Sequence, residues 1–432
     1  MSAELKHRNE YSLRLHSLPI IAHNPSVDLL LFGIGELATP QGKRARGGKE
    51  QGSIHVLHDA YVLVRDGRIE EVRQGHPPSF TGPRLDCGGR CVTPGLVDPH
   101  THAVFAGNRV QEFLARAQGE KYTGGGIFTT VHATRNASEE ELVAQAKPRL
   151  LRMLAQGVTT VEIKSGYGLS LPDELKILRA VRRLGEELPL TLVPTFMGAH
   201  AFPPELSREE YVRLIVEEMI PAVVKEKLAS FCDVFCDRGF YTVEEARTIL
   251  LAAKEYGLGL KIHADELSYV GATELAGELS ATSAEHLLHV SEAGIAALAR
   301  AGTVAVLLPG TAFVLDEPYP PARKLIEAGV PVALGTDFNP GSCPLASLPW
   351  AMSLAVLKLK MTPEEALTAA TLNAAAALGL AEELGTVEPG KRADLVVWDA
   401  QSFREIPYWM GQNLAWAVVK DGRPVAPPLP PS

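Results

Sequence analysis

Val92-Thr-Pro-Gly-Leu-Val-Asp-Pro-His-Thr-His-Ala103 carries two histidines at the end of an apolar run. Residues 95–97 are expected to form a short buried strand that runs up to Pro99. His100 and His102 follow at a spacing of two, which in extended geometry points both imidazoles to the same side. Two neutral imidazoles that converge at a strand end suit a divalent transition metal. On this motif alone, two polar residues in an exposed loop are an equal alternative.

The chain after Cys91 alternates apolar, β-branched stretches with helical stretches, which is the pattern of parallel βαβ units. Eight strands are expected, at 95–98, 159–164, 190–195, 231–235, 260–263, 281–285, 304–308 and 332–336. Helices are expected between them, for example at 139–156, 173–187, 209–228, 242–256, 291–301 and 322–328. Eight β/α repeats predict an α/β fold, a (β/α)8 TIM-type barrel whose active site lies at the carboxyl ends of the strands.

The segments on either side of this barrel are rich in strands. Before it, strands are expected at 29–34, 53–57, 61–65 and 68–72, with Asp66-Gly67 as a hairpin turn. After it come an alanine-rich helix at 362–378 and strands within 390–398 and 416–423, with Asp421-Gly422 as a second turn. The predicted division is a leader at 1–27, the first part of a small β-sandwich domain at 28–90, the barrel at 91–384, and the second part of the β-sandwich at 385–432.

The stretch Pro40 to Gly52 is basic and rich in glycine, a composition that also suits a phosphate or nucleic-acid contact. No aromatic residues interleave with the basic ones and no helix start follows. A mobile surface loop is therefore the favoured prediction.

Composition limits the class of partner. The chain of 432 residues has a formal net charge of −9, which argues against a nucleic-acid or anionic membrane surface and favours a small-molecule substrate. No long apolar run suggests a membrane span or a signal core, so a cytoplasmic location is expected. The five cysteines form no zinc-ribbon pattern and are expected to be buried, inert thiols. The number of subunits stays open, with a homodimer as one candidate.

Further polar residues fall where other barrel strands are expected to end. His200 follows the third strand, His263 and Glu266 the fifth, His286 the sixth, and Asp337 the eighth. A lone histidine is usually structural, but residues that all lie at strand exits converge on one barrel mouth.

These side chains suggest metal-assisted hydrolysis. His100, His102, His263 and Asp337 offer nitrogen and oxygen ligands with room for water. Glu266 is placed to move protons between the nucleophile and the leaving nitrogen. Because no cysteine takes part, one Zn²⁺ or Fe ion fits equally well.

Several motifs resemble the amidohydrolase superfamily over a stretch from about Asp28 to the C-terminus. They are Pro94-Gly-Leu-Val-Asp-Pro-His-Thr-His102, His263, His286, Asp337 and Gly385-Thr-Val-Glu-Pro-Gly-Lys-Arg-Ala-Asp-Leu395. Other segments resemble the imidazolonepropionase family of histidine-degrading enzymes: Phe105-Ala-Gly-Asn-Arg109, 124–127, Val161-Glu-Ile-Lys-Ser-Gly-Tyr-Gly-Leu169, 195–200 and Asp337-Phe-Asn-Pro-Gly-Ser342.

The resemblance implies hydrolysis of the cyclic amide of 4-imidazolone-5-propanoate to N-formimidoyl-L-glutamate. It implies that His100, His102, His263 and Asp337 hold one metal ion, and that His286 and Glu266 act on the nucleophile and the ring. Asp337 is thereby both a metal ligand and, with Glu266 and His286, a catalytic residue. The substrate-binding residues that it implies are Arg109, Tyr122, Tyr167, His200, Glu266, Asn339, Gly341 and Ser342. An arginine and phenolic donors would suit a propionate tail.

Lys164, expected at the end of the second strand, resembles the carboxylated lysine that bridges two metals in some relatives. That lysine belongs on the fourth strand, whose candidate Cys232-Asp-Val-Phe-Cys-Asp237 has no lysine, so a mononuclear site is favoured. Two alternatives stay open. One is a deaminase of a nucleobase-like ring, which would leave Arg109 and Tyr167 without a carboxylate to bind. The other is a catalytically silent structural relative, which would be expected to have lost metal ligands.

Overall fold

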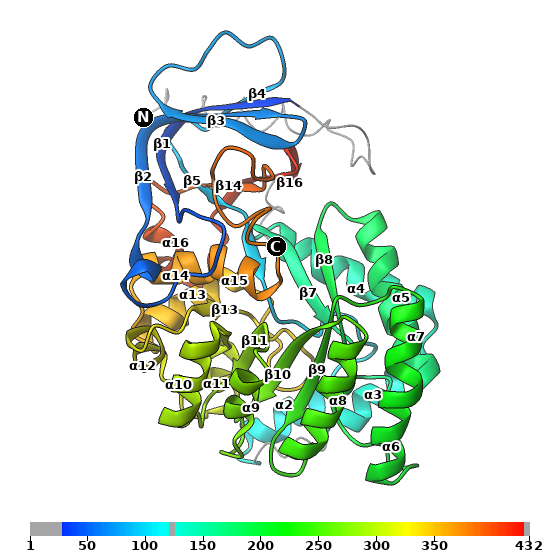
Figure 1. Cartoon of the computed structure of the whole chain (residues 1–432). Coiled ribbons are helices and arrows are strands. Elements are labelled where there is room, and N and C mark those ends of the chain that lie inside the picture. Colours follow the sequence, from blue (N-terminus) through cyan, green and yellow to red (C-terminus); the bar gives the residue numbers. More distant parts are fainter. Residues whose placement is uncertain (1–27, 121–125, 427–432) are drawn as a thin grey trace.

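The structure, a computed structural model, describes residues 28–120 and 126–426. The predicted leader at 1–27 and the predicted substrate residue Tyr122 lie outside this part of the chain. The described residues form a large barrel with a smaller β-sheet domain at one end (Figure 1).

The barrel consists of eight parallel strands arranged side by side in chain order. They are β6 (Leu96–Asp98), β7 (Val158–Lys164), β8 (Thr191–Ala199), β9 (Phe231–Cys236), β10 (Gly259–Ala264), β11 (Ser283–His286), β12 (Val304–Leu307) and β13 (Val332–Leu334). Each overlaps the strand predicted for it, so the predicted TIM-type barrel is confirmed.

The ring closes between β6 and β13 through side-chain and bridge contacts. The Asp98 carboxylate accepts hydrogen bonds from the backbone N–H of Thr336 at 3.0 Å and from its hydroxyl at 2.6 Å. Just beyond the strands, Thr101 and Phe338 form a parallel β-bridge. Because these residues flank His100, His102 and Asp337, closing the ring also brings those three side chains together.

Helices surround the barrel. They are α2 (Val110–Ala117), α3 (Ile127–Asn136), α4 (Glu139–Leu154), α5 (Leu171–Glu187), α6 (Arg208–Leu214), α7 (Ile220–Lys225), α8 (Val243–Glu255), α9 (Ala272–Glu278), α10 (Glu292–Ala301), α11 (Pro309–Leu315), α12 (Ala322–Glu327) and α13 (Leu348–Leu357). Ser138, Ser207 and Thr242 begin α4, α6 and α8 with capping boxes. The helix predicted at 209–228 contains a π-helical turn at Ile215–Met219, between α6 and α7.

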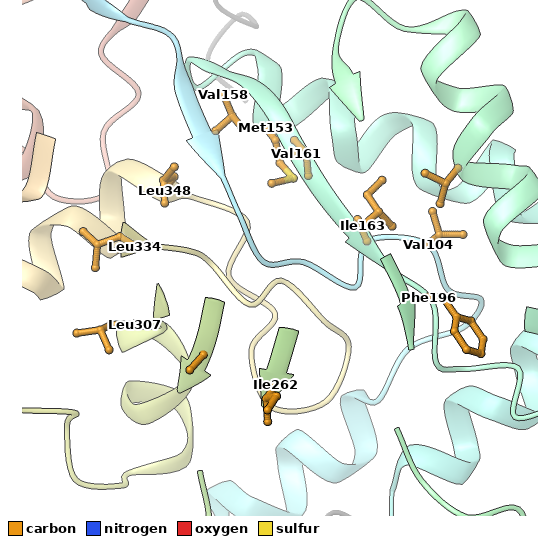
Figure 2. Close-up of a cluster of buried hydrophobic side chains, with 14 of the residues drawn as sticks. Val104, Met153, Val158, Val161, Ile163, Phe196, Ile262, Leu307, Leu334 and Leu348 are labelled. Atoms are coloured by element: carbon orange, nitrogen blue, oxygen red, sulfur yellow. The ribbon is translucent and has the colours of Figure 1, made fainter. Parts of the chain in front are cut away.

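Alternate residues of each barrel strand point outward and pack against these helices. Val161 and Ile163 of β7 and Ile262 of β10 belong to the same buried cluster as Met153 of α4 (Figure 2). The residues between them, such as Glu162 and Lys261, therefore point into the barrel.

The small domain is one sheet in the order β16-β15-β14-β5-β1-β2-β3, with β4 beside β1. Its strands are β1 (Leu29–Thr39), β2 (His55–Arg65), β3 (Arg68–Gln74), β4 (Arg84–Asp86), β5 (Cys91–Pro94), β14 (Leu395–Trp398), β15 (Ala415–Lys420) and β16 (Arg423–Ala426). Val62, Ile69, Leu395 and Val419 share one buried core. The N- and C-terminal segments therefore form one β-sheet domain, as predicted, but as a single continuous sheet and not as two separate sheets of a sandwich. Both predicted Asp-Gly turns form, each with two positive φ angles.

The chain passes from this sheet into the barrel at Gly95, which separates β5 from β6. A Cβ atom on Gly95 would lie 2.3 Å from the Thr159 hydroxyl of β7. A side chain at this position would therefore displace the first barrel strands, which explains the glycine in the opening motif.

The stretch Pro40 to Gly52 is not the mobile surface loop that its composition predicts. It contains a 3-10 turn, Gly48–Gly52, and the side chain of Gln51 is fully buried. That amide donates to the carbonyl of Val332 and accepts from its N–H, both at 3.0 Å. The stretch thus extends the hydrogen bonding of β13, a long-range partner that its local composition cannot reveal.

The helix predicted at 362–378 is two helices, α14 (Pro363–Ala369) and α15 (Leu372–Ala377). The break lies at Thr371, whose φ and ψ of −130° and −90° are not helical. Ala374 and Ala377 of α15 share a core with Val97 and Val304 inside the barrel, so α15 covers the end where the strands begin. The opposite end, where the strands finish, is left for the site.

Two further sequence predictions concern burial and membranes. All five cysteines are buried and free, as expected. Within 28–120 and 126–426, none of the helices combines the length and apolar character needed to cross a membrane.

Candidate metal and substrate site

Three strands deliver the predicted metal ligands to the carboxyl end of the barrel. His100 and His102 follow β6, His263 lies in β10, and Asp337 follows β13. His100 Nε2 lies 3.3 Å from Asp337 Oδ1, and His102 Nε2 lies 3.8 Å from the same oxygen. The rings of His100 and His263 are 4.6 Å apart between centroids. Potential ligand atoms of His100, His102 and Asp337 lie within 4.8 Å of one another, as do those of His100, His263 and His286.

Several ring nitrogens of these histidines are buried and lack hydrogen-bond partners in the described structure. His263 Nδ1 lies 3.0 Å from Asp233 Oδ1, whereas its Nε2 is buried without a hydrogen-bond partner in the described structure. Nε2 of His100 and both nitrogens of His286 are likewise buried without hydrogen bonds. Buried polar atoms without partners are costly, and several that converge with a carboxylate fit a divalent cation.

The charge balance of the cluster agrees with this fit. Burial and the neighbouring His200 hold the pKa of His102 well below its usual value, and burial does the same for His286. Burial also opposes the charge on Asp337, yet the adjacent His100, together with His286 and His102, keeps the pKa of this carboxyl low. His102 and His286 are therefore neutral imidazoles beside an ionised carboxylate, which is the protonation state that metal ligands need. His100 differs, because the charge of Glu285 outweighs its burial and raises its pKa to about 9.

Asp337 is oriented by its own surroundings. Thr311 of α11 donates its hydroxyl proton to Oδ2 at 2.6 Å, so Oδ1 is left to face the histidines. Asp337 and His286 have φ values of 53° and 73°, in the left-handed region. Residues other than glycine rarely adopt this backbone conformation. At these two strand ends it directs both side chains toward the same point.

Glu266 is buried beside this cluster, with Oε2 at 3.5 Å from His286 Nε2. Burial and the charges of Asp337 and Asp237 raise its pKa well above the usual value. Its loop is fixed on both sides, because Asp237 accepts from the N–H of Leu267 at 2.7 Å and Asp265 accepts from that of Val270 at 2.8 Å. Glu266 is thus a positioned group that can hold a proton.

A cavity opens directly over the cluster. It is lined by most of the predicted site residues, namely His102, Arg109, Tyr167, His200, His263, Glu266, His286, Asp337, Asn339 and Ser342. His100 lies beneath it and is fully buried. An apolar wall from Ile127, Phe235, Phe240 and Leu267 completes the lining. Sequence reasoning missed that wall, because nothing local distinguishes these apolar residues from those of the core.

Arg109 brings a positive charge into this cavity. Its side chain is 3% exposed and pairs with Glu112 of α2. A Cβ atom on Gly341 would lie only 2.0 Å from Arg109 Nη1, and Arg116 donates to the Gly341 carbonyl at 2.9 Å. Gly341, predicted to bind substrate, is not among the residues that line the cavity, and it instead leaves the space that lets the guanidinium lie against the backbone.

Aromatic rings form the side of the cavity nearest His102. The ring of His200 stacks on His102 with centroids 4.9 Å apart, and Tyr167 lies 5.4 Å from His200. Burial, with the neighbouring His263, lowers the pKa of His200 to about 3, so its ring is neutral at pH 7. The loop that carries Tyr167 is held by Glu174, which accepts from the N–H groups of Gly168 and Leu169 at 2.8 Å.

Asn339 mainly organises its own loop. Its amide accepts from the N–H groups of Gly341 and Ser342, both at 2.8 Å, and donates to Ser342 Oγ at 2.9 Å. It lines the cavity together with Ser342, so both are placed where a ligand would lie.

Charged residues inside the barrel were not foreseen from the sequence. They are Glu162, Asp233, Lys261 and Glu285, which join Lys164 below the histidines. Lys164 lies among three carboxylates as a paired cation. The available signal was the alternation of charged with apolar residues in strands that are otherwise buried.

The family comparison agrees with this arrangement. Residues 91–428 match the family model described as "Amidohydrolase family". Solved structures share the fold: an adenosine deaminase from Xanthomonas campestris with bound zinc has a TM-score of 0.70 over 93% of both chains at 19% identity. An atrazine chlorohydrolase from Arthrobacter aurescens TC1, complexed with zinc, has a TM-score of 0.71 over 92% of this chain and 94% of that one at 18% identity. The chain therefore belongs to the amidohydrolase family.

Curated relatives define a narrower group within it. The chain is 52% identical to the imidazolonepropionase of Symbiobacterium thermophilum over 92% of this chain and 97% of that protein. It is 49% identical to the imidazolonepropionase of Porphyromonas gingivalis W83 over 93% and 98%, respectively. Within the amidohydrolases, the chain belongs with the imidazolonepropionases.

Proposed function

We propose that this protein hydrolyses the cyclic amide of 4-imidazolone-5-propanoate to N-formimidoyl-L-glutamate, a step of histidine degradation. The observation that carries the proposal is the buried guanidinium of Arg109 in the same cavity as His102, His263 and Asp337. Such a cavity suits a ligand with a carboxylate at one end and a hydrolysable ring at the other. The names of the curated relatives agree with it.

We assign one divalent ion, Zn²⁺ or Fe, to His100, His102, His263 and Asp337. The bound ion would polarise the ring carbonyl and make water a better nucleophile at neutral pH. Imidazole and carboxylate ligands without cysteine accept either metal.

The protein's own groups would divide the remaining work. Glu266 takes a proton from the attacking water as the C–O bond forms, and gives a proton to the ring nitrogen as the C–N bond breaks. His286, 3.5 Å from Glu266, contacts the nucleophile or the carbonyl oxygen. Arg109 and Tyr167 hold the propionate, and His200 lies against the ring; Asn339, Gly341 and Ser342 border the product. Tyr122 completes the proposed set.

The test is an assay of the purified, metal-loaded protein. Added imidazolonepropionate should lose its ultraviolet absorbance as the ring opens, while cytosine and guanine stay intact. Deamination of either base without loss of imidazolonepropionate would replace the proposal by a deaminase. No turnover of any of the three by metal-loaded protein would favour a catalytically silent relative.

The remaining proposals concern the setting of the enzyme. We place the enzyme in the cytoplasm. Its partner is a small-molecule substrate, and we propose no nucleic-acid or membrane partner. A homodimer is the assembly to test first. Size measurement in solution tests the last point.

A further inference from the structure

Five charged side chains lie inside the barrel directly below the histidines, and none is exposed to solvent. This group, here called the interior charge cluster, consists of Glu162, Lys164, Asp233, Lys261 and Glu285. Each comes from a position that points into the barrel on β7, β9, β10 or β11. The cluster separates the apolar core around α15 from the proposed metal site.

Lys164 is the centre of this cluster. Its ammonium lies 2.7 Å from Asp233 Oδ2, 2.9 Å from Glu285 Oε2 and 3.0 Å from Glu162 Oε2. Three carboxylates around an ammonium match its three N–H donors.

Two of these carboxylates also contact proposed metal ligands. Asp233 Oδ1 lies 3.0 Å from His263 Nδ1, and Glu285 Oε2 lies 2.5 Å from His100 Nδ1. In both rings Nδ1 faces the cluster, so Nε2 faces the cavity side. A carboxylate at Nδ1 fixes the ring orientation and the tautomer in which Nε2 keeps a lone pair for a metal.

Stability alone is a weak reason to bury such a cluster. Removing charges from water costs several kcal/mol per ion, and well-packed apolar residues often replace a buried ion pair without loss. This cluster contacts Nδ1 of His263 and of His100, so it can orient two proposed metal ligands.

We propose that Lys164 is a positioning residue for the metal. By binding Asp233 and Glu285 together, it fixes the carboxylates that orient His263 and His100. The inference rests on the metal site proposed above, and it adds that affinity for the ion depends on a lysine that never touches it.

Lys261 provides a matched control within the same cluster. It is equally buried and carries the same charge. However, its ammonium approaches the other oxygens, Glu162 Oε1 at 3.2 Å and Glu285 Oε1 at 3.4 Å, and within the described structure it makes no ion pair with Asp233. Lys164→Met and Lys261→Met therefore remove the same buried charge. Only Lys164→Met removes the cation from the Glu285 oxygen next to His100 and from Asp233, whose other oxygen contacts His263.

The experiment measures Zn²⁺ affinity of metal-free protein by competition with a chromophoric chelator. Lys164→Met should weaken binding by about 10- to 100-fold, and Lys261→Met by less than about threefold. Equal weakening in the two variants, or no weakening in Lys164→Met, would overturn the proposal. Wild-type protein that binds no Zn²⁺ and no Fe²⁺ would instead refute the metal site itself, which keeps the two failures apart.

A second variant covers the case in which Lys164→Met does not fold. Lys164→Met combined with Glu162→Gln removes one charge of each sign, so the net charge of the cluster is unchanged. It still leaves Asp233 and Glu285 without Lys164, and should show the same loss of Zn²⁺ affinity. Wild-type affinity in this folded double variant would contradict the proposal.

Discussion

Glu266 shows how one residue acquires a chemical role from its surroundings. An exposed glutamate is ionised at pH 7, whereas burial and the nearby Asp337 and Asp237 charges raise the pKa of Glu266 well above that of an exposed carboxyl. The loop on either side is fixed, so the carboxyl stays 3.5 Å from His286. A carboxyl with a raised pKa, held beside His286, suits proton transfer.

Glu266→Gln tests this role. The amide keeps the size of the side chain but cannot exchange a proton, so kcat on imidazolonepropionate should fall by roughly a hundredfold or more while the metal content stays unchanged. Steady-state kinetics and metal analysis measure the two quantities. Glu278→Gln, an exposed change on α9, serves as the control. Full activity of Glu266→Gln would remove the residue from the mechanism.

At this scale the sequence predicts residues at strand ends better than residues within strands. His100, His263 and Asp337 stand where apolar runs stop, so their convergence follows from the barrel topology. Asp233 and Glu285 lie within buried strands, and their use depends on Lys164 from a strand far away in the sequence. No local pattern contains that partner.

At the scale of elements, the segment that follows β13 illustrates how a loop positions a distant side chain. Asn339 bonds the backbone of Gly341, and Gly341 in turn lies against Arg109 from the segment before α2. The predicted motif 337–342 therefore works as one unit with the residue that is proposed to bind the propionate.

Gly341→Ala should displace Arg109, because the added Cβ would lie 2.0 Å from Nη1. We expect a rise in the KM for imidazolonepropionate of about tenfold, with a smaller change in kcat, and the same direction for Arg109→Ala. Gly185→Ala within α5, where the nearest atom to the new Cβ is 3.9 Å away, is the control. An unchanged KM in Gly341→Ala would show that the carboxylate is bound elsewhere.

The hairpin of β15 and β16 offers a test of stability. Asp421 in its turn bonds Arg392 at 2.8 and 2.9 Å, and these contacts, with Lys420, outweigh its partial burial and lower its pKa to about 2. A lowered pKa in the folded state means that the stabilisation is complete above the unfolded pKa of 3.8 and is lost as the pH falls through about 2.

Asp421→Asn should therefore lower the free energy of unfolding at pH 7. Because the side chain is 46% exposed, solvent screening limits the loss to at most about 1 kcal/mol. The difference in thermal midpoint between wild type and variant should shrink to about half by pH 3. A difference that grows as the solution is acidified would contradict this sign.

The sequence predicts the elements themselves well where the periodicity is long or the turn chemistry is strong. The eight strands and both Asp-Gly turns are of this kind. The break at Thr371 and the docking of Gln51 on Val332 cannot be predicted in this way. Both depend on packing at the end of the barrel where the strands begin. Tertiary contacts overrode local propensity at these places.

At the scale of the whole molecule, the proposed metal joins parts of the chain that are far apart. His100 and His102 follow β6, while Asp337 follows β13, and these are the two strands where the barrel closes. His263 adds β10 from the opposite part of the ring. A ligand that binds only the folded state stabilises it by mass action, by about 4 kcal/mol when its concentration is a thousand times Kd.

Adding Zn²⁺ to metal-free protein should therefore raise the unfolding temperature by several degrees, measured by calorimetry at a fixed excess of metal. His263→Ala should abolish most of this shift, because it removes the ligand through which the metal connects β10 to β6 and β13. His289→Ala is the matched control, since His289 belongs to none of the potential metal groups among the described residues and should keep the full shift. If His263→Ala retained the shift and His289→Ala lost it, the metal would bind outside the barrel mouth.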